Sequence, residues 1–227
     1  MTLTHTLQQI FENLFKEYGP QSWWPADTPF EVMVGAILTQ NTAWGNAEKA
    51  LADLSKVCDL TPEGILSLAP EQLQEAIRPS GYFRQKAARL RGFCQFLAQR
   101  YGGDPSSMAP VPIAELRDEL LSLHGIGPET ADSILLYALG RPVFVVDAYT
   151  VRLFSRIGLC EEKSKYDDVQ SLFMKNLQID AQMFNEYHAL IVRHSKRTCT
   201  KRNPGCGKCA LFDMCAFDLK SQISDLK

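Results

Sequence analysis

The segment 120–147, LLSLHGIGPETADSILLYALGRPVFVVD, constrains the fold of this chain most strongly. It places Gly125-Ile126-Gly127 between two helical patterns, and after an apolar run it ends on Asp147. Two glycines allow a tight turn with positive backbone angles, and Ile126 can hold that turn against a core. Backbone N–H groups at such a turn, followed by a helix start, form a site for an anion, although an ordinary structural turn is the alternative. A dinucleotide-binding turn does not fit, because no strand pattern precedes the glycines.

Apolar residues recur at helical spacing along most of the 227-residue chain, which predicts an all-α protein with short Gly- and Pro-containing connections. Stripes at 7–15, 30–38 and 83–97 are the clearest, and further helices are expected at 42–55, 70–77, 113–122, 128–139, 147–158, 165–177 and 180–195. Pro128 stands where a first-turn proline belongs. The only strand-like run, Val143 to Val146, is short and isolated. With 45% hydrophobic residues, the chain can bury a core as one large domain or two small ones.

The N-terminal segment indicates a cytoplasmic protein with no membrane partner. It contains Glu12 and Glu17 and lacks a basic leader, which argues against secretory or mitochondrial targeting. No stretch approaches the roughly 20 apolar residues that a membrane helix needs. We therefore also expect the cysteines to be reduced, with Cys58, Cys94 and Cys160 as small core residues.

The other four cysteines form a cluster with the pattern Cys199-x6-Cys206-x2-Cys209-x5-Cys215. Four thiolates within such a short segment indicate a metal centre rather than disulfides in a reducing compartment. Their spacing alone leaves tetrahedral zinc and an iron-sulfur cluster as competing interpretations.

Charge is distributed unevenly although the formal net charge is only −2. No Asp or Glu occurs from Tyr187 to Phe212, whereas six basic residues do: Arg193, Lys196, Arg197, Lys201, Arg202 and Lys208. Such a local surface can neutralise phosphates even on an acidic protein, and a solvated face is the alternative on charge alone.

Three motifs occur together in a recognisable order: L-x-x-L-H-G-I-G-P-E-T-A, then V-V-D, then the four cysteines. In this order and at these separations they resemble the helix-hairpin-helix DNA glycosylases of the endonuclease III superfamily, from about Phe30 to Cys215. The resemblance implies a two-lobed all-α fold with a C-terminal [4Fe-4S] cluster loop. It places a helical barrel at 28–140, with the helix-hairpin-helix at about 113–139, and a second helical domain at 1–27 plus 141–227, with the cluster at 199–215. DNA is expected to cross a cleft between the two lobes.

The resemblance also implies roles for the opening segment. The hairpin residues Gly125, Ile126 and Gly127, with Thr130, are expected to bind phosphates of double-stranded DNA around a damaged nucleotide, often with a bound monovalent cation. Asp147 matches the catalytic carboxylate of the family. A flipped-out nucleotide that loses its base develops positive charge on the sugar, which a nearby carboxylate stabilises. Asp147 also suits the role of helix cap, and the two roles are compatible.

Glu129 departs from the strand-cleaving members of the family. Those members carry a lysine two residues after the second hairpin glycine, and here Glu129 stands at that position. A carboxylate cannot form a Schiff base, so the covalent route to strand cleavage is missing. The sequence therefore predicts a monofunctional glycosylase with little or no lyase activity at the abasic site.

For the four cysteines, the resemblance implies a [4Fe-4S] cluster with a structural role, since small loop-rich tails need a staple. Lys201 and Arg202 lie in the first loop between these cysteines, which in the family presents basic side chains to the DNA backbone.

The segments WWP, LTQNTAW and RPSGYFRQKAARL, together with the hairpin, resemble the 3-methyladenine glycosylase branch of the superfamily. That branch implies that Trp23, Trp24, Pro25 and Trp44 form the pocket for the flipped base, and that Lys196 matches a carbamylated lysine. Electron-rich rings attract a cationic alkylated purine such as 3-methyladenine. The branch typically lacks the cluster, however, so this chain combines features of two branches. A glycosylase for oxidised pyrimidines and a non-catalytic lesion-binding protein are the alternatives.

Two further residues are expected to enter the DNA stack. Gln40 matches the side chain that fills the gap left by the flipped nucleotide, and Tyr82 matches a wedge in the opposite strand. Emptying a base stack is costly unless another group replaces the base. Ordinary helix-end packing is the alternative for both residues. We expect the protein to act as a monomer.

Overall fold

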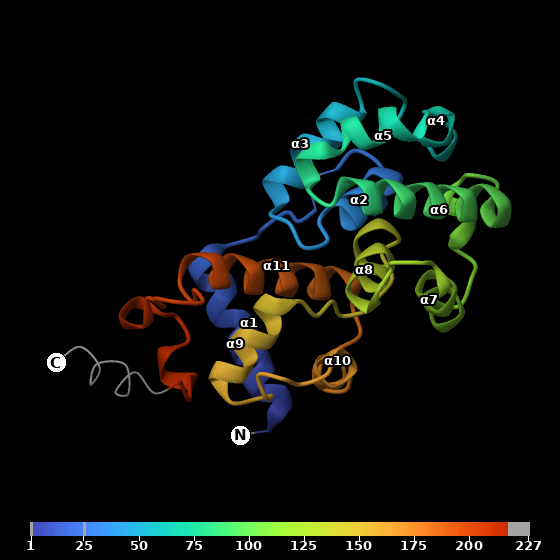
Figure 1. Cartoon of the computed structure of the whole chain (residues 1–227). Coiled ribbons are helices and arrows are strands. Elements are labelled where there is room, and N and C mark those ends of the chain that lie inside the picture. The colour runs from blue at the N-terminus through green and yellow to red at the C-terminus, as the bar shows by residue number, and fades with distance from the viewer. Residues whose placement is uncertain (1, 25, 218–227) are drawn as a thin grey trace. The chain divides into compact units, whose positions relative to one another are not determined.

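The computed structural model describes residues 2–24 and 26–217. Its regular structure is helical throughout these residues, which confirms the predicted all-α class (Figure 1). None of the described helices combines the length and the apolar character needed to cross a bilayer. The chain divides into two compact units, one made of Trp24–Arg141 and the other of Met1–Trp23 with Pro142–Lys227.

The Trp24–Arg141 unit is built around one helix that is apolar on all sides. Its helices are α2 (Pro29–Leu38), α3 (Trp44–Leu54), α4 (Pro62–Ser67), α5 (Pro70–Ala76), α6 (Phe83–Tyr101), α7 (Ile113–Ser122) and α8 (Pro128–Ser133), followed by a π-helical turn at Ile134–Ala138. Eight of the ten residues of α2 are buried, because α3, α6, α8 and the π turn surround it. A helix that is apolar all round belongs in the centre of a bundle.

Proline and threonine mark the helix starts in this unit. Helices α2, α4, α5 and α8 each begin with a proline, whose missing N–H costs nothing in the first turn. Thr28 and Thr61 accept hydrogen bonds from backbone N–H groups of α2 and α4, at 3.1 and 3.0 Å. Helix α4 was not expected from periodicity, because six residues are too few to show it, and the Thr61-Pro62 pair is its only local signal.

The other unit joins the first helix to the C-terminal half of the chain. It contains α1 (Leu3–Tyr18), α9 (Ala148–Ile157), α10 (Tyr166–Met174) and α11 (Ala181–Arg197), with α11 packed against both α1 and α9. Aromatic rings fill its core, and Phe144 stacks on Phe173 with ring centroids 3.7 Å apart. Buried Tyr187 of α11 donates a hydrogen bond to the Leu7 carbonyl of α1 at 2.8 Å. Residues 180 positions apart are thus fixed together in one core.

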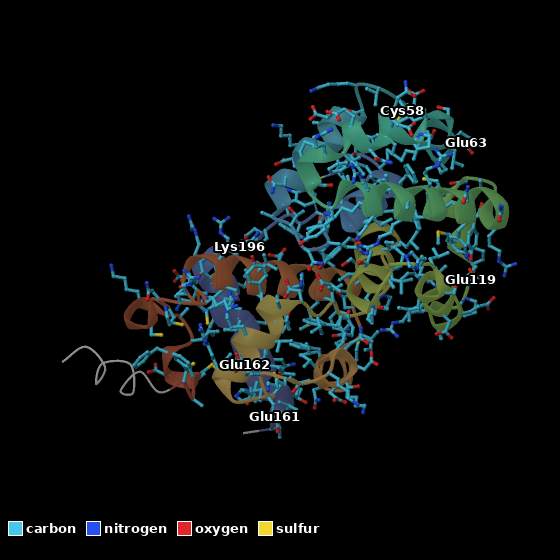
Figure 2. The ribbon with its side chains drawn as sticks, in the orientation of Figure 1. Cys58, Glu63, Glu119, Glu161, Glu162 and Lys196 are labelled. Carbon is cyan, nitrogen blue, oxygen red and sulfur yellow. The ribbon has the colours of Figure 1, made fainter. Side chains whose placement is uncertain are left out.

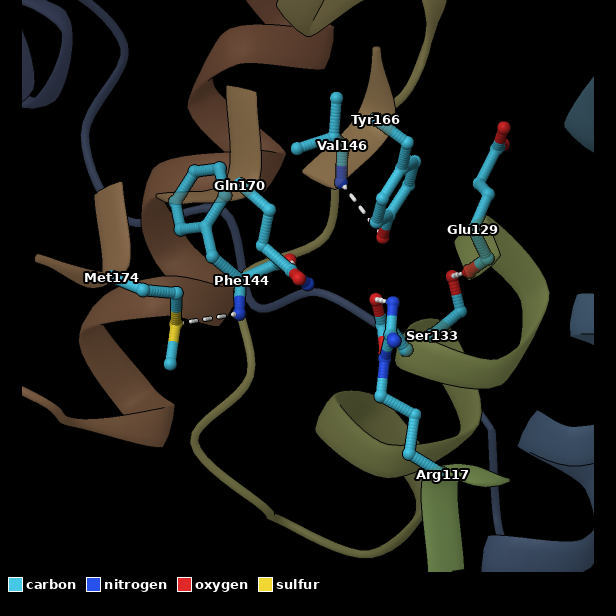
Figure 3. A network of polar contacts seen from close by, with 9 residues as sticks. Arg117, Glu129, Ser133, Phe144, Val146, Tyr166, Gln170 and Met174 are labelled. Carbon is cyan, nitrogen blue, oxygen red and sulfur yellow. Dashed lines mark hydrogen bonds and ion pairs between the residues drawn. The ribbon is translucent and has the colours of Figure 1, made fainter. Parts of the chain in front are cut away.

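The strand-like run Val143–Val146 is buried, but it forms no strand in the described structure. Side chains of α10 take the place of a partner strand (Figure 3). Tyr166 Oη accepts the Val146 N–H at 3.3 Å, Gln170 donates to the Phe144 carbonyl at 2.7 Å, and Met174 Sδ lies 3.4 Å from the Phe144 nitrogen. Buried backbone groups need partners, and these side chains supply them. The segment that leads to Asp147 is therefore held in place by α10.

Candidate functional site

Asp147 caps α9 with one carboxylate oxygen. Its Oδ1 accepts the backbone N–H of Thr150 at 2.7 Å and the Thr150 hydroxyl at 2.9 Å. The Thr150 hydroxyl in turn lies 3.4 Å from the Asp147 nitrogen, so the cap is reciprocal. This arrangement fixes the direction of the carboxylate and leaves Oδ2 for another partner.

His188 faces that second oxygen. It lies on α11, and its Nε2 is 3.6 Å from Asp147 Oδ2, with the histidine and aspartate side chains 7% and 13% exposed. Burial opposes ionisation of Asp147, but the positive charge of nearby His188 and the hydrogen bonds from Thr150 outweigh it, so the pKa of Asp147 lies below its ordinary value. The carboxylate is therefore ionised at neutral pH. Sequence reasoning missed His188, because one histidine inside an apolar helix face carries no signal of its partner.

Lys196 lies exposed near the C-terminal end of α11 (Figure 2). Its ammonium is 5.8 Å from the centre of the Tyr149 ring, and the Arg152 guanidinium is 5.1 Å from the same ring. Arg152 also donates to the backbone carbonyls of Ser195 and Cys199, at 2.9 and 3.0 Å, and so ties α9 to the end of α11. The unit thus brings together one acidic and two basic side chains around the start of α9.

The hairpin has the expected position between α7 and α8, but its two glycines differ. Gly125 has a φ of +80°, in the left-handed region, whereas Gly127 has an ordinary φ of −97° and caps α8. Ile126 is 5% exposed and its N–H bonds to the Leu123 carbonyl at 3.1 Å. The predicted anchoring of the turn by Ile126 is consistent with this burial, and only Gly125 needs glycine for its conformation.

Gln40 links the loop after α2 to the hairpin. Its amide nitrogen donates to the Gly125 carbonyl at 3.0 Å and to Thr130 Oγ1 at 2.9 Å, and its amide oxygen accepts from Arg89 of α6 at 2.6 Å. Arg89 covers Gly125 so closely that a Cβ atom there would collide with it. Thr130, expected to contact DNA, is 6% exposed and serves this internal network. The hairpin is therefore braced by residues far from it in sequence.

A buried ion pair braces the two helices of the hairpin. Arg117 of α7 donates two hydrogen bonds to Asp132 of α8, at 2.7 and 3.1 Å, and the Asp132 side chain is fully buried. Ser133 donates to the Glu129 backbone carbonyl at 2.7 Å, while the Glu129 side chain projects away from Ser133 (Figure 3). Glu129 is exposed in the first turn of α8. The position that carries lysine in strand-cleaving relatives is thus on the surface of this unit.

Aromatic rings gather beside α2. Trp24 packs edge-to-face on Trp44 with ring centroids 4.8 Å apart, and its centroid is 5.2 Å from that of Tyr137. Gly35 of α2 makes room for Trp24, since a Cβ there would lie 3.3 Å from the ring. Tyr137 was missed by the sequence reasoning; it lies in the π-helical turn, a conformation frequent at functional sites. Trp23 is half-buried in the other unit, and Pro25 lies outside the described residues.

Tyr82 stands out from the surface just before α6. Its side chain is 66% exposed, and its φ of +47° is left-handed, which is rare for a residue with a side chain. Asn41, next to Gln40, has a φ of +53° and is also exposed. The two loops predicted to enter DNA therefore both contain strained backbone.

The four cysteines line one cavity of about 590 Å³, together with apolar side chains such as Leu153, Ile157 and Leu211. Burial raises the pKa of Cys206, and the charges of Cys199 and Cys215 raise it further, so the thiols share one electrostatic environment. Arg156 of α9 donates to Cys199 Sγ at 3.2 Å, and the Leu211 N–H donates to Cys209 Sγ at 3.4 Å. Among the described residues, no three His, Cys, Asp or Glu side chains converge closely enough to hold one metal ion.

This donor set fits a metal centre held by thiolates. Four thiols line a volume with apolar walls, and thiolates are the ligands of both tetrahedral zinc and iron-sulfur clusters. Thiolates are the ligands of iron-sulfur clusters, and N–H groups directed at the sulfurs tune such centres. Lys201 and Arg202 are exposed on the loop between the first two cysteines. Arg156 holds that loop through the Thr200 and Lys201 carbonyls, at 2.8 and 3.1 Å.

Comparison with known proteins identifies the family. Residues 34–178 match the family model described as HhH-GPD superfamily base excision DNA repair protein. The chain is 48% identical, over 92% of its length and 95% of the relative's, to a protein of Methanocaldococcus jannaschii named "Putative DNA repair glycosylase". It is 31% identical to endonuclease III of Thermotoga maritima, over 83% of each chain.

Solved structures agree with this assignment. A non-covalent endonuclease III–DNA complex superimposes with a TM-score of 0.83 at 23% identity over the whole of both chains. The H. pylori 3-methyladenine DNA glycosylase bound to 1,N6-ethenoadenine gives a TM-score of 0.73 at 30% identity, over 87% of this chain and 98% of that one. The fold, the motifs and the relatives together show that this chain belongs to the HhH-GPD superfamily, as a DNA glycosylase of base excision repair.

Proposed function

We propose that this protein is a monofunctional DNA glycosylase that hydrolyses the N-glycosidic bond of a flipped alkylated purine such as 3-methyladenine. The observation that supports this proposal most strongly is the geometry of Asp147. Thr150 and His188 keep its carboxylate ionised and fix its direction. An ionised, fixed carboxylate stabilises the positive charge that grows on a sugar as its base departs. No covalent attachment to the protein is needed for this step.

Release of the base without strand cleavage follows from Glu129. A lyase reaction through a Schiff base requires an amine nucleophile, and the first turn of α8 offers a carboxylate at the family's lysine position. Endonuclease III relatives are bifunctional, so this substitution separates the chain from them within the same fold. The product is an intact strand with an abasic site.

The choice of substrate rests on the aromatic rings. Trp24, Trp44 and Tyr137 present π faces or edges to one another beside α2. An N3-alkylated adenine is cationic, so stacking on such rings stabilises it more than a neutral base. The similarity to the H. pylori glycosylase at 30% identity supports the same preference. By resemblance to that branch, Trp23, Pro25 and Lys196 are also proposed as base-binding residues.

The proposed DNA contacts are the hairpin and the loop between the first two cysteines. Gly125 and Gly127 offer backbone N–H groups to phosphates, and a monovalent cation at the hairpin carbonyls would favour the same contact. Lys201 and Arg202 add charge on the loop beside the cysteines. The four cysteines are proposed to hold a [4Fe-4S] cluster, which would staple this loop in place when bound. The protein is proposed to bind damaged double-stranded DNA as a monomer.

Incubation with a panel of lesion-containing duplexes, followed by mass spectrometry of the released bases, tests the substrate. We expect release of 3-methyladenine by the wild type and none by Asp147→Asn. Release of oxidised pyrimidines in preference to alkylated purines would contradict the substrate class. Tight binding across the panel with no release would indicate a lesion-binding protein instead. Iron, sulfide and zinc analysis of an anaerobic preparation tests the cluster, and stoichiometric zinc without iron would exclude it.

A further inference from the structure

Lys86 places a charged ammonium group in the protein interior, where loss of hydration is energetically unfavourable. Lys86 of α6 is 1% exposed, and its ammonium donates to two backbone carbonyls, that of Leu38 at 2.8 Å and that of Ser80 at 2.6 Å. Leu38 ends α2, and Ser80 ends the 3₁₀ turn Arg78–Ser80. Helix ends carry unpaired carbonyls and partial negative charge, so the ammonium closes two of them at once.

The Lys86 side chain stays mostly protonated although it is buried. Burial lowers the pKa of Lys86 to about 8, and the positive charge of Arg89 acts in the same direction. At neutral pH the side chain is still mostly protonated, and a buried charge of this kind is kept only where its hydrogen bonds matter. An apolar side chain of similar length would fill the same space without that cost, but it would leave both carbonyls without a donor.

The chain that follows each of these carbonyls carries a predicted DNA contact. After Leu38 come Thr39, Gln40 and the left-handed Asn41; after Ser80 come Gly81 and the left-handed Tyr82. Strained backbone persists only where the surrounding structure holds it. The Lys86 ammonium binds the residue just before each loop, and the Lys86 backbone N–H donates to the Tyr82 carbonyl at 3.0 Å.

Helix α6 makes a second attachment one turn later. Arg89 donates to the side-chain oxygen of Gln40 at 2.6 Å. The backbone and the side chain of the α2–α3 loop are thus fixed to the same helix that begins directly after Tyr82. The first two turns of α6 therefore form a common platform for both loops.

We propose that Lys86 is a positioning residue that joins the loops of Gln40 and Tyr82 into one rigid unit, so that the two side chains engage DNA together. The proposal rests on the proposed function and on the sequence prediction that Gln40 and Tyr82 both contact DNA. If the two side chains engage DNA only together, removal of either one should abolish most of the contribution of the other to DNA affinity. If the two loops acted independently, the losses of DNA affinity in the two single variants would instead multiply in the double variant.

A double-mutant cycle on binding tests this coupling without any assumption about the substrate. The probe is a duplex that carries one tetrahydrofuran abasic analogue, with undamaged duplex as competitor. Gln40→Ala and Tyr82→Ala should each reduce the preference for the analogue about tenfold, the usual effect of losing one stacking side chain. The double variant should lose little more than either single variant. In a Lys86→Met background, the two losses should multiply toward on the order of a hundredfold.

The control separates positioning from simple destabilisation. Phe93 is fully buried about two turns further along the same helix, so Phe93→Leu lowers stability without changing the Lys86 ammonium or its hydrogen bonds. It should leave the coupling intact while lowering the thermal midpoint. If Lys86→Met does not fold, Lys86→Gln, which keeps N–H donors on a shorter neutral side chain, takes its place and should also lose the coupling.

Three outcomes would overturn the proposal: multiplicative losses in the wild-type background, unchanged coupling in the Lys86 variants, or the same loss of coupling in Phe93→Leu. If neither single substitution affected binding to the analogue, the assignment of the two DNA contacts would fail and the proposal with it. Base release by the wild-type protein would still report separately on the proposed catalytic function.

Discussion

Asp132 and Asp147 are both nearly buried carboxylates, each in a different unit and each facing a basic side chain, yet their surroundings differ. Both oxygens of Asp132 are occupied by the fork of Arg117. Asp147 uses one oxygen as a helix cap and presents the other to His188 at 3.6 Å, which is longer than a normal hydrogen bond. A bidentate arginine pair fixes structure, whereas a carboxylate with one loosely held oxygen keeps charge available for a substrate. The comparison predicts opposite consequences of substitution at the two sites.

Substitution of Asp147 should have the largest effect on activity. Asp147→Asn removes the negative charge, and we expect base release to fall on the order of a thousandfold, the range seen when one electrostatic stabiliser is lost. Asparagine caps helices about as well as aspartate, so stability should change by less than about 1 kcal/mol. Single-turnover base release and chemical denaturation measure the two effects. A large loss of stability with little change in the rate of base release would show that Asp147 serves only as the N-cap of α9.

Substitution of Asp132 should show the reverse pattern. Asp132→Ala breaks the bidentate pair between α7 and α8, and removal of one partner of a buried pair typically destabilises a protein by about 3–5 kcal/mol. The free energy of unfolding in urea is the measurement. The double variant Asp132→Ala with Arg117→Met also removes the arginine charge and should recover part of the lost stability. A variant of normal stability that cannot release bases would make Asp132 functional and break the comparison.

His188 should control the ionisation of Asp147. The pKa of Asp147 is lowered even though burial opposes ionisation, because His188 and Thr150 favour the charged form. His188→Gln removes one of these contributions, so that pKa should rise and the acidic limb of the rate profile should move to higher pH. Asp147 should stay ionised near neutral pH in both proteins, so the rate there should change little. An unmoved acidic limb would show that His188 does not act on Asp147.

Alanine substitutions at the two hairpin glycines should have the smallest effects, and they compare two closely matched positions. Gly125→Ala requires a side chain at a φ of +80° and displaces Arg89, so it should cost at least about 1 kcal/mol and weaken DNA binding. Gly127→Ala meets open space at a φ of −97° and should leave stability nearly unchanged. Thermal unfolding and duplex affinity measure both. Equal effects at the two positions would contradict the difference in backbone described above.

Local patterns were enough to predict the all-α class, the position of the hairpin and most helices, because periodicity, prolines and caps act over a few residues. The family assignment from the motifs at 120–147 and the cysteines is likewise confirmed. What escaped prediction depends on contacts between distant positions. Gln40 meets Gly125 across 85 residues. Val143–Val146 lacks a strand partner because α10 supplies side chains instead. His188 and Tyr137 gave no signal, since each acquires its role only from a neighbour brought by the fold.

The central claim is that base release proceeds here without strand cleavage. It is tested most directly by quantifying released base and broken strand in the same reaction on duplex DNA containing 3-methyladenine, before and after alkali. The account predicts nearly full base release, few breaks before alkali, and breaks equal to released bases after it. Breaks that match base release before alkali, lost together with base release in Asp147→Asn, would contradict it.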